Sequence, residues 1–247
     1  MKRLDLPPLS AAENLAADET LLDWCESGAG NETLLFWEPR ETFVVIGYAN
    51  KVATEVNVAA CEANGVPIFR RCSGGGAVVQ MPGGLNYSLI LRITETGHTR
   101  NITAANQFIM EKNRAAIANT FRQSAIRNPQ SAISVRGHTD LCLGDLKFAG
   151  NSQRRRKHFL LFHGTVLLNC DLKRISELLL MPSQQPDYRA GRTHAEFVTN
   201  LNCSAALVKS ALAEAWNASE EFNEPPRDKI TRLAHEKYST RAWNSKF

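Results

Sequence analysis

The chain has 247 residues, of which 43% are hydrophobic, 22% charged and 8% aromatic, and its 29 basic and 25 acidic residues leave a formal net charge of +4. This composition is typical of a globular protein and excludes disordered and fibrous classes, and so small a charge excess does not indicate nucleic-acid binding. The most apolar stretch, residues 159–168, is interrupted by polar residues and is shorter than the roughly 18 residues that cross a bilayer, so no membrane-spanning segment is expected.

The first residues, MKRLDLPPLS, lack the apolar segment of a secretory signal, so the predicted location is the cytoplasm. Six cysteines lie far apart, with neither a Cys-x-x-Cys pair nor a histidine cluster at ligand spacing. We therefore expect no zinc site and interpret the cysteines as buried, reduced side chains. They are Cys25, Cys61, Cys72, Cys142, Cys170 and Cys203.

No internal repeat or low-complexity linker divides the chain, which favours one continuous domain. Ser10 followed by Glu13 predicts a capping box that starts a helix over residues 11–25. Asp18 falls on the apolar face of this helix, where an acidic residue is either paired with a buried base or close to a functional site.

Two β-rich runs, residues 33–37 and 43–47, flank a turn-like sequence and suggest a β-hairpin. Alternating apolar and polar residues over 85–93 predict a half-buried strand, and Gly144-Asp145 predicts a tight hairpin turn. Hairpin-linked antiparallel strands with helices outside them indicate a mixed α+β class. Further strands are predicted at 66–71, 77–80, 141–143, 146–148 and 158–168, and helices at 103–121, 172–180, 205–216 and 230–238.

The densest chemical feature is RRCSGGGA, residues 70–77, in which two arginines run into three glycines between two predicted strands. Three glycines after a serine suit a backbone that approaches a ligand closely and directs its N–H groups at an anion. The arginines are permanently charged forks for phosphate or carboxylate. The alternative is a glycine-rich bend whose arginines form surface ion pairs. Neither a Walker loop nor a dinucleotide-binding fingerprint occurs in the sequence.

A second feature is Lys147, which follows the predicted turn in TDLCLGDLKFAGNSQ. A lysine on a strand usually faces solvent, and which face Lys147 occupies depends on what packs there. A third is His163 in FHGT, since a single histidine within a strand is most often a core residue. The basic block Arg154 to Lys157 is typical of a solvated turn.

Three motifs in this order, RRCSGGGAVVQMPGGLNYSL, GDLKFAGNSQ and FHGTVLLNCDL, closely resemble the catalytic domain of the biotin/lipoate protein ligase family, most of all its lipoate-protein ligase A branch. Further landmarks, from AENLAADETLL to EKYSTRAWN, extend the resemblance over nearly the whole chain, 1–247, as a single catalytic domain. The resemblance implies an α+β fold with a mixed, largely antiparallel sheet flanked by helices, similar to class II aminoacyl-tRNA synthetases and biotin ligases.

The resemblance also implies a reaction. Family members use ATP, with Mg²⁺, to convert lipoate or octanoate into an acyl adenylate and then pass the acyl group to a lysine of a carrier domain. Lys147 matches the family's catalytic lysine and would offset the charge that builds at the α-phosphate. The resemblance indicates no particular metal ligand. It places the following residues against the acyl adenylate: Arg70, Arg71, Ser73, Gly74, Gly75, Gly76, Ala77, Gln80, Asn86, Asp140, Gly150, Asn151, His163 and Gly164.

The expected partner is an acidic lipoyl carrier domain, either of a 2-oxoacid dehydrogenase or the glycine cleavage H protein, without membrane or nucleic acid. As a hypothesis, the basic block Arg154 to Lys157 attracts that acidic surface. The sequence departs from the family at Gln80, where histidine is common, and at Thr139, where asparagine is common. It also ends before the C-terminal accessory domain of many ligases, so we expect a separate accessory subunit or a pre-activated acyl donor.

The closest alternative is an octanoyltransferase that moves acyl groups between carriers through a cysteine thioester, without ATP. Its nucleophile would align with Leu160 or within residues 131–139, and neither offers a cysteine. A biotin ligase is less similar, because that branch has a different glycine-rich arginine loop. A non-catalytic acyl- or nucleotide-binding module is the alternative of another class, and we would expect it to lack Lys147.

Overall fold

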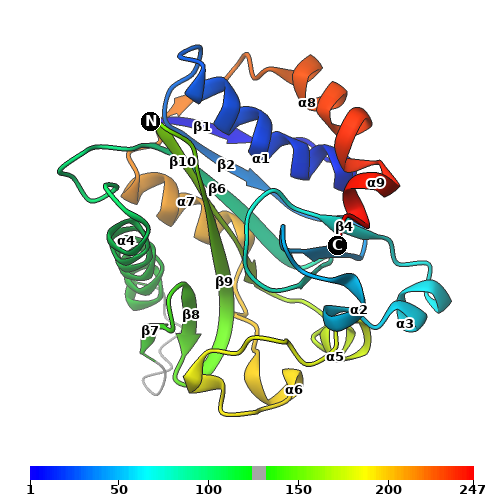
Figure 1. Ribbon diagram of the computed structural model, residues 1–247. Helices are drawn as coiled ribbons and strands as arrows, with labels where there is room; N and C mark the ends of the chain where they lie inside the picture. The colour runs from blue at the N-terminus through cyan, green and yellow to red at the C-terminus, as the bar shows by residue number, and fades with distance from the viewer. Residues whose placement is uncertain (124–131) are drawn as a thin grey trace.

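The computed structural model describes residues 1–123 and 132–247. Within them, eight strands form one mixed sheet in the order β11-β1-β2-β6-β10-β9-β8-β7 (Figure 1). All pairs from β2 to β7 are antiparallel, and β1 pairs parallel with β2 and β11. The strands are β1 (Lys2–Asp5), β2 (Thr33–Trp37), β6 (Gly84–Arg92), β7 (Ile133–Arg136), β8 (Asp140–Leu143), β9 (Leu146–Arg155), β10 (Phe159–Leu167) and β11 (Glu220–Glu221).

A second, smaller sheet contains β4 (Ile68–Arg70), β3 (Phe43–Ile46) and β5 (Val78–Gln80), in that order. The predicted hairpin between residues 33–37 and 43–47 is therefore wrong, because β2 and β3 belong to different sheets. The physical reason is that both edges of β2 are already paired, one with β1 and the other with β6.

Helices cover both faces of the large sheet (Figure 1). On one face, α1 (Ala11–Glu26) packs against α8 (Arg227–Leu233) and the π-helical turn η2 (Ala234–Tyr238), which leads to α9 (Arg241–Asn244). On the other face, α4 (Ile102–Gln123) packs against α7 (Ala205–Ala215). Of the shorter helices, α2 (Val52–Glu55) and α3 (Val58–Ala63) lie at the right of Figure 1, and α5 (Lys173–Leu178) and α6 (His194–Phe197) lie below them. The 3₁₀ turn η1 (Asp187–Arg189) precedes α6 in the chain.

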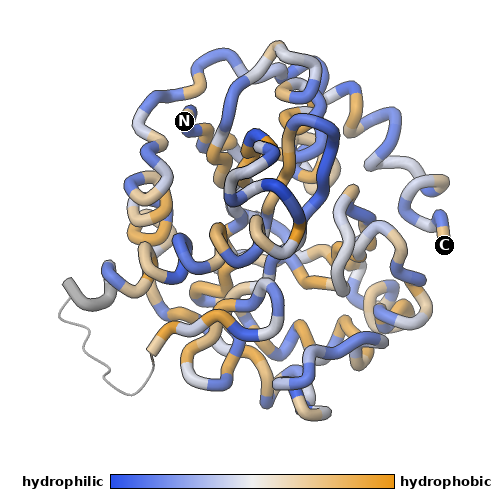
Figure 2. Tube along the Cα trace, turned by 60° about the vertical axis from the view of Figure 1, so that its left-hand side comes forward, coloured by the Kyte–Doolittle hydropathy of each residue, from blue (hydrophilic) through white to orange (hydrophobic). Residues whose placement is uncertain are grey.

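The sheet divides the core into one cluster under α4 and α7 and another under α1 and α8, and a third cluster surrounds the small sheet. Figure 2 shows apolar segments where the helices meet the strands and hydrophilic segments around them. None of the helices in the described residues combines the length and apolar character needed to cross a bilayer.

Several local predictions are confirmed. The Ser10 and Glu13 capping box starts α1, and Gly144 has the positive φ that its turn requires. The strand predicted at 85–93 exists as β6, but it is not half-buried. Only Arg92 of β6 is exposed, because helices cover both faces of the sheet. The polar side chains Asn86 and Ser88 are therefore buried.

The pairing of β6, β10 and β9 produces two neighbouring rows of residues across the sheet. We call one the junction row, which contains Gly150, Thr165, Asn86 and Trp37. The other is the inner row, which contains Ser152, His163, Ser88 and Leu35. Both rows lie on the side of the sheet that α1 covers, since their apolar members Trp37 and Leu35 pack in the α1 cluster.

Candidate active site

Two cavities lie next to each other above these rows and share part of their lining. The inner cavity, with a volume of about 130 Å³, reaches apolar side chains of α1, β2 and β3, namely Leu15, Trp37 and Val45. The outer cavity is larger and extends toward η1 and α6. Eight residues line both: Gly75, Gly76, Ala77, Val78, Lys147, Gly150, Asn151 and Thr165. Lys147 thus stands where the two cavities meet.

The Lys147 side chain is fixed by its charge partner and by the strand beneath it. Its Nζ lies 2.8 Å from Oδ1 of Asp140, and the Tyr188 hydroxyl donates to Asp140 Oδ2 at 2.7 Å. A Cβ at Gly150 would come within 2.7 Å of both Cε and Nζ of Lys147. Gly150 is therefore required for the lysine to lie across β9 and reach the junction. The backbone carbonyl of Lys147 accepts from the Thr199 amide at 2.9 Å.

A β-bulge determines which way Lys147 faces. Leu141 pairs with Ala149, but Cys142 pairs with Lys147, so Phe148 is an extra residue in β9. A bulge interrupts the alternation of side chains along a strand. Lys147 consequently shares a face with Gly150, three positions away, and the Phe148 side chain enters the core on the other face.

The glycine-rich loop, residues 71–76, has its carbonyl groups held by surrounding donors. Ser73 O accepts from the Tyr48 amide at 2.8 Å, and Gly74 O accepts from Ser152 Oγ at 2.8 Å. No backbone amide of residues 73–76 donates to an acceptor within the described residues. Gly75 has φ +86°, a left-handed conformation that turns successive amides the same way. The N–H groups of residues 73–76 are therefore not used within the described protein, and Gly75 and Gly76 line both cavities.

The two arginines of the motif have different roles. Arg71 lines the inner cavity and donates to Gly74 O and Gly76 O, while its Nη1 has no protein partner within the described residues. Burial lowers the pKa of Arg71 to about 10, which leaves the side chain cationic at neutral pH. Arg71 thus holds the glycine-rich loop through Nε and Nη2, while its Nη1 is buried without a partner in the described part of the chain.

Arg70 does not face either cavity. Its guanidinium is fully buried and donates to five backbone carbonyl groups. These carbonyls belong to Gly47, Tyr48, Asn50, Trp243 and Asn244. The expectation that Arg70 contacts the acyl adenylate is therefore not met; the residue joins the loop after β3 to α9.

His163 lines the inner cavity and belongs to a buried chain of hydrogen bonds. Its Nδ1 lies 2.6 Å from Asp18 Oδ2, and its Nε2 lies 2.6 Å from Ser73 Oγ. Ser88 Oγ donates to Asp18 Oδ1 at 2.5 Å. Asp18 and Ser88 were not among the predicted site residues, although an acidic residue on the apolar face of α1 was the signal that pointed to Asp18.

A second polar group stands on the junction row. Gln80 and Asn86 hydrogen-bond to each other through both of their amide groups, at 2.8 and 2.9 Å. Thr165 Oγ1 donates to Asn86 Oδ1 at 2.6 Å and accepts from Gln80 Nε2 at 2.8 Å. Thr165 was missed by the sequence prediction because a threonine in a strand has no distinctive signal.

Asn151 and Gly164 are complementary in shape. A Cβ at Gly164 would come within 1.8 Å of Asn151 Oδ1, so only glycine fits there. The same oxygen accepts from the Tyr87 hydroxyl at 2.6 Å, and Asn151 Nδ2 donates to Thr139 O at 2.8 Å. Thr139, where the family often has asparagine, thus holds Asn151 through its backbone.

Most of the predicted site residues come together. The inner cavity is lined by Arg71, Gly75, Gly76, Ala77, Gln80, Asn86, Lys147, Gly150, Asn151, His163 and Gly164. Asp140 lines the outer cavity. Arg70, Ser73 and Gly74 line neither. Tyr188, which also lines the outer cavity, was not predicted individually.

The cysteines are all buried, as expected, and none of the six lines either cavity. Burial raises the pKa of each thiol, to about 12 at Cys72 and about 11 at Cys170. A thiolate is the nucleophilic form, so these thiols are poorly suited to carry an acyl group at neutral pH. Burial also raises the pKa of the four other thiols, which belong to Cys25, Cys61, Cys142 and Cys203.

The described residues contain no group of three or more His, Cys, Asp or Glu side chains that could hold a metal ion. Asp140, the carboxylate nearest the junction, has both oxygens engaged by Lys147 and Tyr188.

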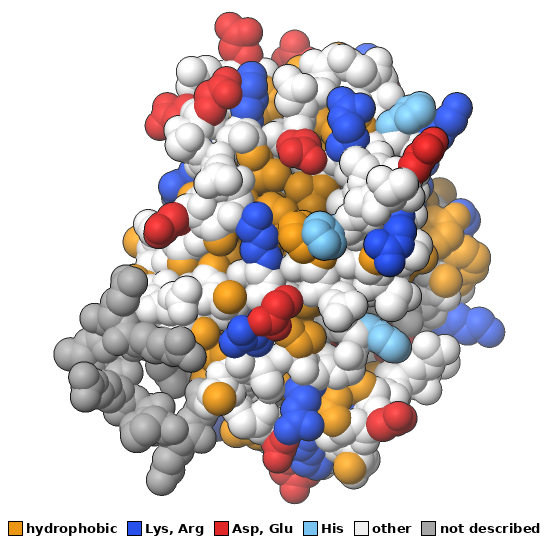
Figure 3. Space-filling model, turned by 90° about the vertical axis from the view of Figure 1, so that its left-hand side faces the viewer, with side chains coloured by type: hydrophobic (Ala, Val, Ile, Leu, Met, Phe, Trp, Pro, Cys, Tyr) orange, Lys and Arg blue, Asp and Glu red, His pale blue; other side chains and the backbone are white. Residues whose placement is uncertain are grey.

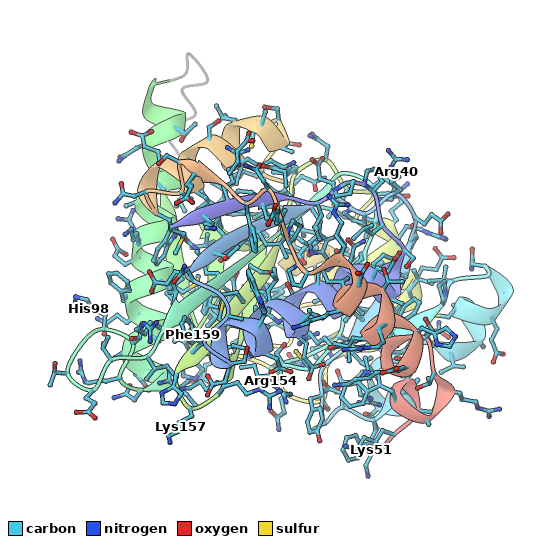
Figure 4. All side chains as sticks on the ribbon, turned by 90° about the horizontal axis from the view of Figure 1, so that it is seen from above. Arg40, Lys51, His98, Arg154, Lys157 and Phe159 are labelled. Atoms are coloured by element: carbon cyan, nitrogen blue, oxygen red, sulfur yellow. The ribbon has the colours of Figure 1, made fainter. Side chains whose placement is uncertain are left out.

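The basic block is not the freely solvated turn that the sequence suggested. Arg154 and Arg155 end β9, and Arg154 donates to Cys72 O of the glycine-rich loop at 2.5 Å. Arg155 donates to Thr99 O at 2.8 Å, and Arg156 pairs with Asp23 at 2.7 Å. In Figure 4, Arg154 lies beside α1 and Lys157 is at the outer edge. Three of the four cations are thus used within the protein, and we do not retain the block as a carrier-docking site.

The face drawn in Figure 3 carries Lys and Arg side chains interspersed with Asp and Glu, without a continuous basic stripe. Such mixed charge is typical of an ordinary protein surface rather than of a nucleic-acid footprint.

Comparison with known proteins identifies the family. The lipoyl protein ligase A/B catalytic domain matches residues 10–216. The chain belongs to this family. The chain is similar to the octanoyltransferase LipM of Geobacillus kaustophilus, with 27% identity over 95% of this chain and 94% of the length of LipM. The chain is also similar to lipoate-protein ligase A subunit 1 of Thermoplasma acidophilum, with 26% identity over 96% of this chain and 93% of the length of that subunit.

Solved structures agree with the predicted fold. A Thermoplasma acidophilum bipartite lipoate protein ligase, described with its E2 lipoyl domain, is 25% identical and aligns over 99% of this chain and 96% of its own with a TM-score of 0.77. A lipoate-protein ligase A bound with ATP is 25% identical, with a TM-score of 0.74 over 99% of this chain and 98% of its own. The predicted family and the mixed, helix-flanked sheet are confirmed.

Proposed function

We propose that this member of the lipoyl and octanoyl transfer family is an ATP-dependent lipoate-protein ligase. It activates lipoate, or octanoate, as the acyl adenylate and transfers the acyl group to a lysine of a lipoyl carrier domain. The observation that carries the proposal is the position of Lys147 at the junction of two cavities. An acyl adenylate is an elongated molecule with an apolar arm, a central mixed anhydride and a nucleoside, and the two cavities suit its two ends.

The acyl arm occupies the inner cavity in this proposal, against Leu15, Trp37 and Val45. The nucleotide occupies the outer cavity, which is large enough for it and is bounded by η1 and α6. The mixed anhydride then lies beside Lys147 and the glycine-rich loop. A site that encloses the anhydride excludes water, which would otherwise hydrolyse it.

In the first half-reaction, a carboxylate oxygen of lipoate attacks the α-phosphorus of ATP. The bond to the β-phosphate bridging oxygen breaks, and pyrophosphate leaves. Negative charge builds on the α-phosphate oxygens, and the Lys147 ammonium and the loop amides offset it. Mg²⁺ would enter with the ATP phosphates, which usually supply most of its ligands together with water.

In the second half-reaction, the neutral amine of the acceptor lysine attacks the acyl carbon. The new C–N bond forms, the C–O bond to AMP breaks, and AMP leaves as the more stable anion. The proton of the amine passes to solvent. Lys147 holds the departing phosphate oxygen during this step, because its ammonium remains beside the same group.

An octanoyltransferase is the second candidate, and the similarity to LipM favours it. That chemistry needs a nucleophile to carry the acyl group between two carriers. None of the six cysteines lines a cavity, and burial raises the pKa of each. The ligase is therefore the better supported of the two.

The proposed acceptor is the lipoyl domain of a 2-oxoacid dehydrogenase or the H protein of glycine cleavage. The similarity to a ligase described with its E2 lipoyl domain supports the first. We also propose that residues 1–247 act as one catalytic domain and that a separate accessory subunit assists activation, since the Thermoplasma relative is described as bipartite.

The test uses the purified chain with lipoate, ATP labelled at the β-phosphate and an apo-lipoyl domain. We expect labelled pyrophosphate to be released and the lipoyl domain to be acylated. Transfer from an octanoylated carrier without ATP, together with no pyrophosphate release even after a candidate accessory subunit is added, would replace the ligase by the octanoyltransferase.

A further inference from the structure

We propose that Asp18 is a positioning residue of this site: acting through His163 and Ser73, it fixes the glycine-rich loop in the conformation that presents free amides to the anhydride. The placement of the loop is a property of the unliganded protein, and only its kinetic consequence rests on the proposed function. Asp18 makes no contact with the junction itself, since it lines the inner cavity alone.

The hydrogen-bond chain specifies one tautomer of His163. A carboxylate oxygen can only accept, so Nδ1, at 2.6 Å from Asp18 Oδ2, carries the ring hydrogen. In the neutral ring, Nε2 then accepts from the hydroxyl of Ser73, at 2.6 Å. Ser73 Oγ in turn accepts from Arg71 Nε at 3.1 Å. Each donor in this chain meets an acceptor and each acceptor a donor.

Burial makes this arrangement hard to replace. Asp18 is 4% exposed, His163 9% and Ser73 1%, so water cannot readily substitute for a lost partner. Leaving a buried polar group unpaired costs about 1–3 kcal/mol. The other oxygen of Asp18 is held by Ser88, which keeps the carboxylate oriented toward His163.

Position argues against a direct chemical role for these groups. His163 belongs to the inner row, one row away from the junction row, and is absent from the residues that line both cavities. Ser73 lines neither cavity, so its hydroxyl is not placed to take up an acyl group. The hydrogen bonds from Asp18 through His163 to Ser73 therefore act on the glycine-rich loop and not on the acyl carbon.

Ser73 is the residue through which this series of hydrogen bonds reaches the glycine-rich loop. Its hydroxyl bonds both His163 and Arg71, and its carbonyl accepts from the Tyr48 amide at 2.8 Å. Arg71 then holds the carbonyls of Gly74 and Gly76. If His163 loses Asp18, its ring is free to change tautomer, Ser73 loses its acceptor, and the hold of Arg71 on the loop weakens.

The first test needs no enzymatic activity. Nitrogen-15 NMR of the unliganded chain should show His163 as the Nδ1–H tautomer. In Asp18→Ala we expect a mixture of tautomers and exchange of the Tyr48 amide that is about tenfold faster, because its bond to Ser73 O is weakened. Asp228→Ala, at an exposed aspartate of α8 that makes no side-chain hydrogen bond or ion pair within the described residues, is the matched control and should change neither. An unchanged tautomer and unchanged exchange in Asp18→Ala would overturn the proposal.

The second test measures its consequence. We expect kcat/KM for acyl activation to fall about 10–100-fold in Asp18→Ala, as is usual when support of a catalytic group is removed. Asp18→Asn keeps an acceptor for Nδ1–H and should recover most of the loss, which also covers the case in which the alanine variant fails to fold.

A double mutant decides whether the two residues act together. If Asp18 acts only through Ser73, then Asp18→Ala combined with Ser73→Ala should be no slower than the slower single variant. Multiplied losses would contradict the proposal. If the wild-type chain activates no acyl group, the proposed function fails, whereas the NMR and exchange results still decide the role of Asp18.

Discussion

The ammonium of Lys147 has little freedom in this site. Asp140 holds it from the outer cavity at 2.8 Å, and the space over Gly150 is the path by which the side chain crosses β9. The side chain is 28% exposed, so the charge stays partly solvated while it lies within reach of both cavities. A cation placed in this way stabilises charge that develops between the cavities without having to move.

Lys147→Ala should abolish both half-reactions and leave the fold intact. The alanine removes the cation that offsets charge at the α-phosphate, and a loss of at least about 100-fold is expected for such a group. Pyrophosphate release and transfer from synthetic lipoyl adenylate are to be measured separately. Lys157→Ala, at an exposed site, is the control. Full pyrophosphate release by the Lys147 variant would contradict the assigned role, and retained transfer alone would confine the lysine to activation.

Gly150→Ala should displace Lys147 without removing its charge. The new Cβ would lie 2.7 Å from Cε and Nζ, so the side chain must move away. Because a misplacement of about 1 Å can reduce catalysis by about 100-fold, we expect a loss of that order in kcat with little change in melting temperature. If this variant had wild-type kinetics, the position of the Lys147 side chain across Gly150 would not be required for catalysis.

Sequence patterns predicted the residue types of the site but not all of their directions. Lys147, the glycines and His163 were recognisable from their motifs. The bulge at Phe148 was not, because it depends on the pairing of β9 with β8. Arg70 and Arg71 could not be distinguished from the sequence either, because their difference also depends on long-range packing. In the fold, Arg70 donates to backbone carbonyls of α9, which leaves it unavailable to a ligand.

At the scale of elements, a buried carboxylate connects α1 to the C-terminal segment. Glu19 accepts from Lys237 Nζ at 2.5 Å and from the Tyr238 hydroxyl at 2.7 Å. Arg154 and Arg156 lie within 3.8 Å of its other oxygen. Arg154 also holds the carbonyl of Cys72, so the same cluster supports the glycine-rich loop.

Glu19 should make stability depend on pH. Burial by itself raises the pKa of Glu19, but the hydrogen bonds from Lys237 and Tyr238 and the nearby Arg154 outweigh it, and the net pKa lies below 4.5. A lowered carboxyl pKa in the folded state contributes stability that is present above about pH 4.5 and is lost as the pH falls through the folded value.

Glu19→Gln should therefore reduce the free energy of unfolding at pH 7 by about 1–3 kcal/mol. The difference from wild type should shrink as the pH is lowered below about 4.5, since the wild-type carboxylate then becomes protonated. Urea unfolding at several pH values measures this. A difference that stays constant from pH 7 to pH 3 would show that the charge of Glu19 has no part in it.

Arg70→Lys should loosen α9. A lysine has three donors on one nitrogen and cannot reproduce five carbonyl contacts made by a planar guanidinium. We expect a loss of about 1–3 kcal/mol in unfolding free energy and faster amide exchange in residues 241–245. Arg232→Lys, on the exposed side of α8, should be neutral. Equal effects of the two substitutions would contradict a specific role for Arg70.

The sequence predicted most elements within a few residues, because helix caps, turns and periodicity are local signals. It did not predict that β2 and β3 join different sheets, since the choice between partners depends on which strand edges remain free. For the same reason the burial of β6 on both faces, which brings Asn86 and Ser88 into the site, could not be read from its alternating pattern.

At the scale of the whole molecule, the fold alone does not decide the reaction. The chain is similar over nearly its full length both to an octanoyltransferase and to a lipoate-protein ligase subunit. What separates the two candidates is local: a lysine at the junction of two cavities, and thiols that lie elsewhere. The central claim is therefore that a single elongated intermediate occupies both cavities at once and meets Lys147 in the middle.

The most direct measurement is a crystal structure of the chain with lipoyl sulfamoyladenosine, a stable analogue in which a sulfamoyl group replaces the phosphate. We expect the lipoyl arm in the inner cavity against Trp37, the nucleoside in the outer cavity, and Lys147 Nζ within hydrogen-bonding distance of the sulfamoyl oxygens. An analogue bound with its acyl arm outside the inner cavity, or with Lys147 still on Asp140 and out of reach of the sulfamoyl group, would contradict it.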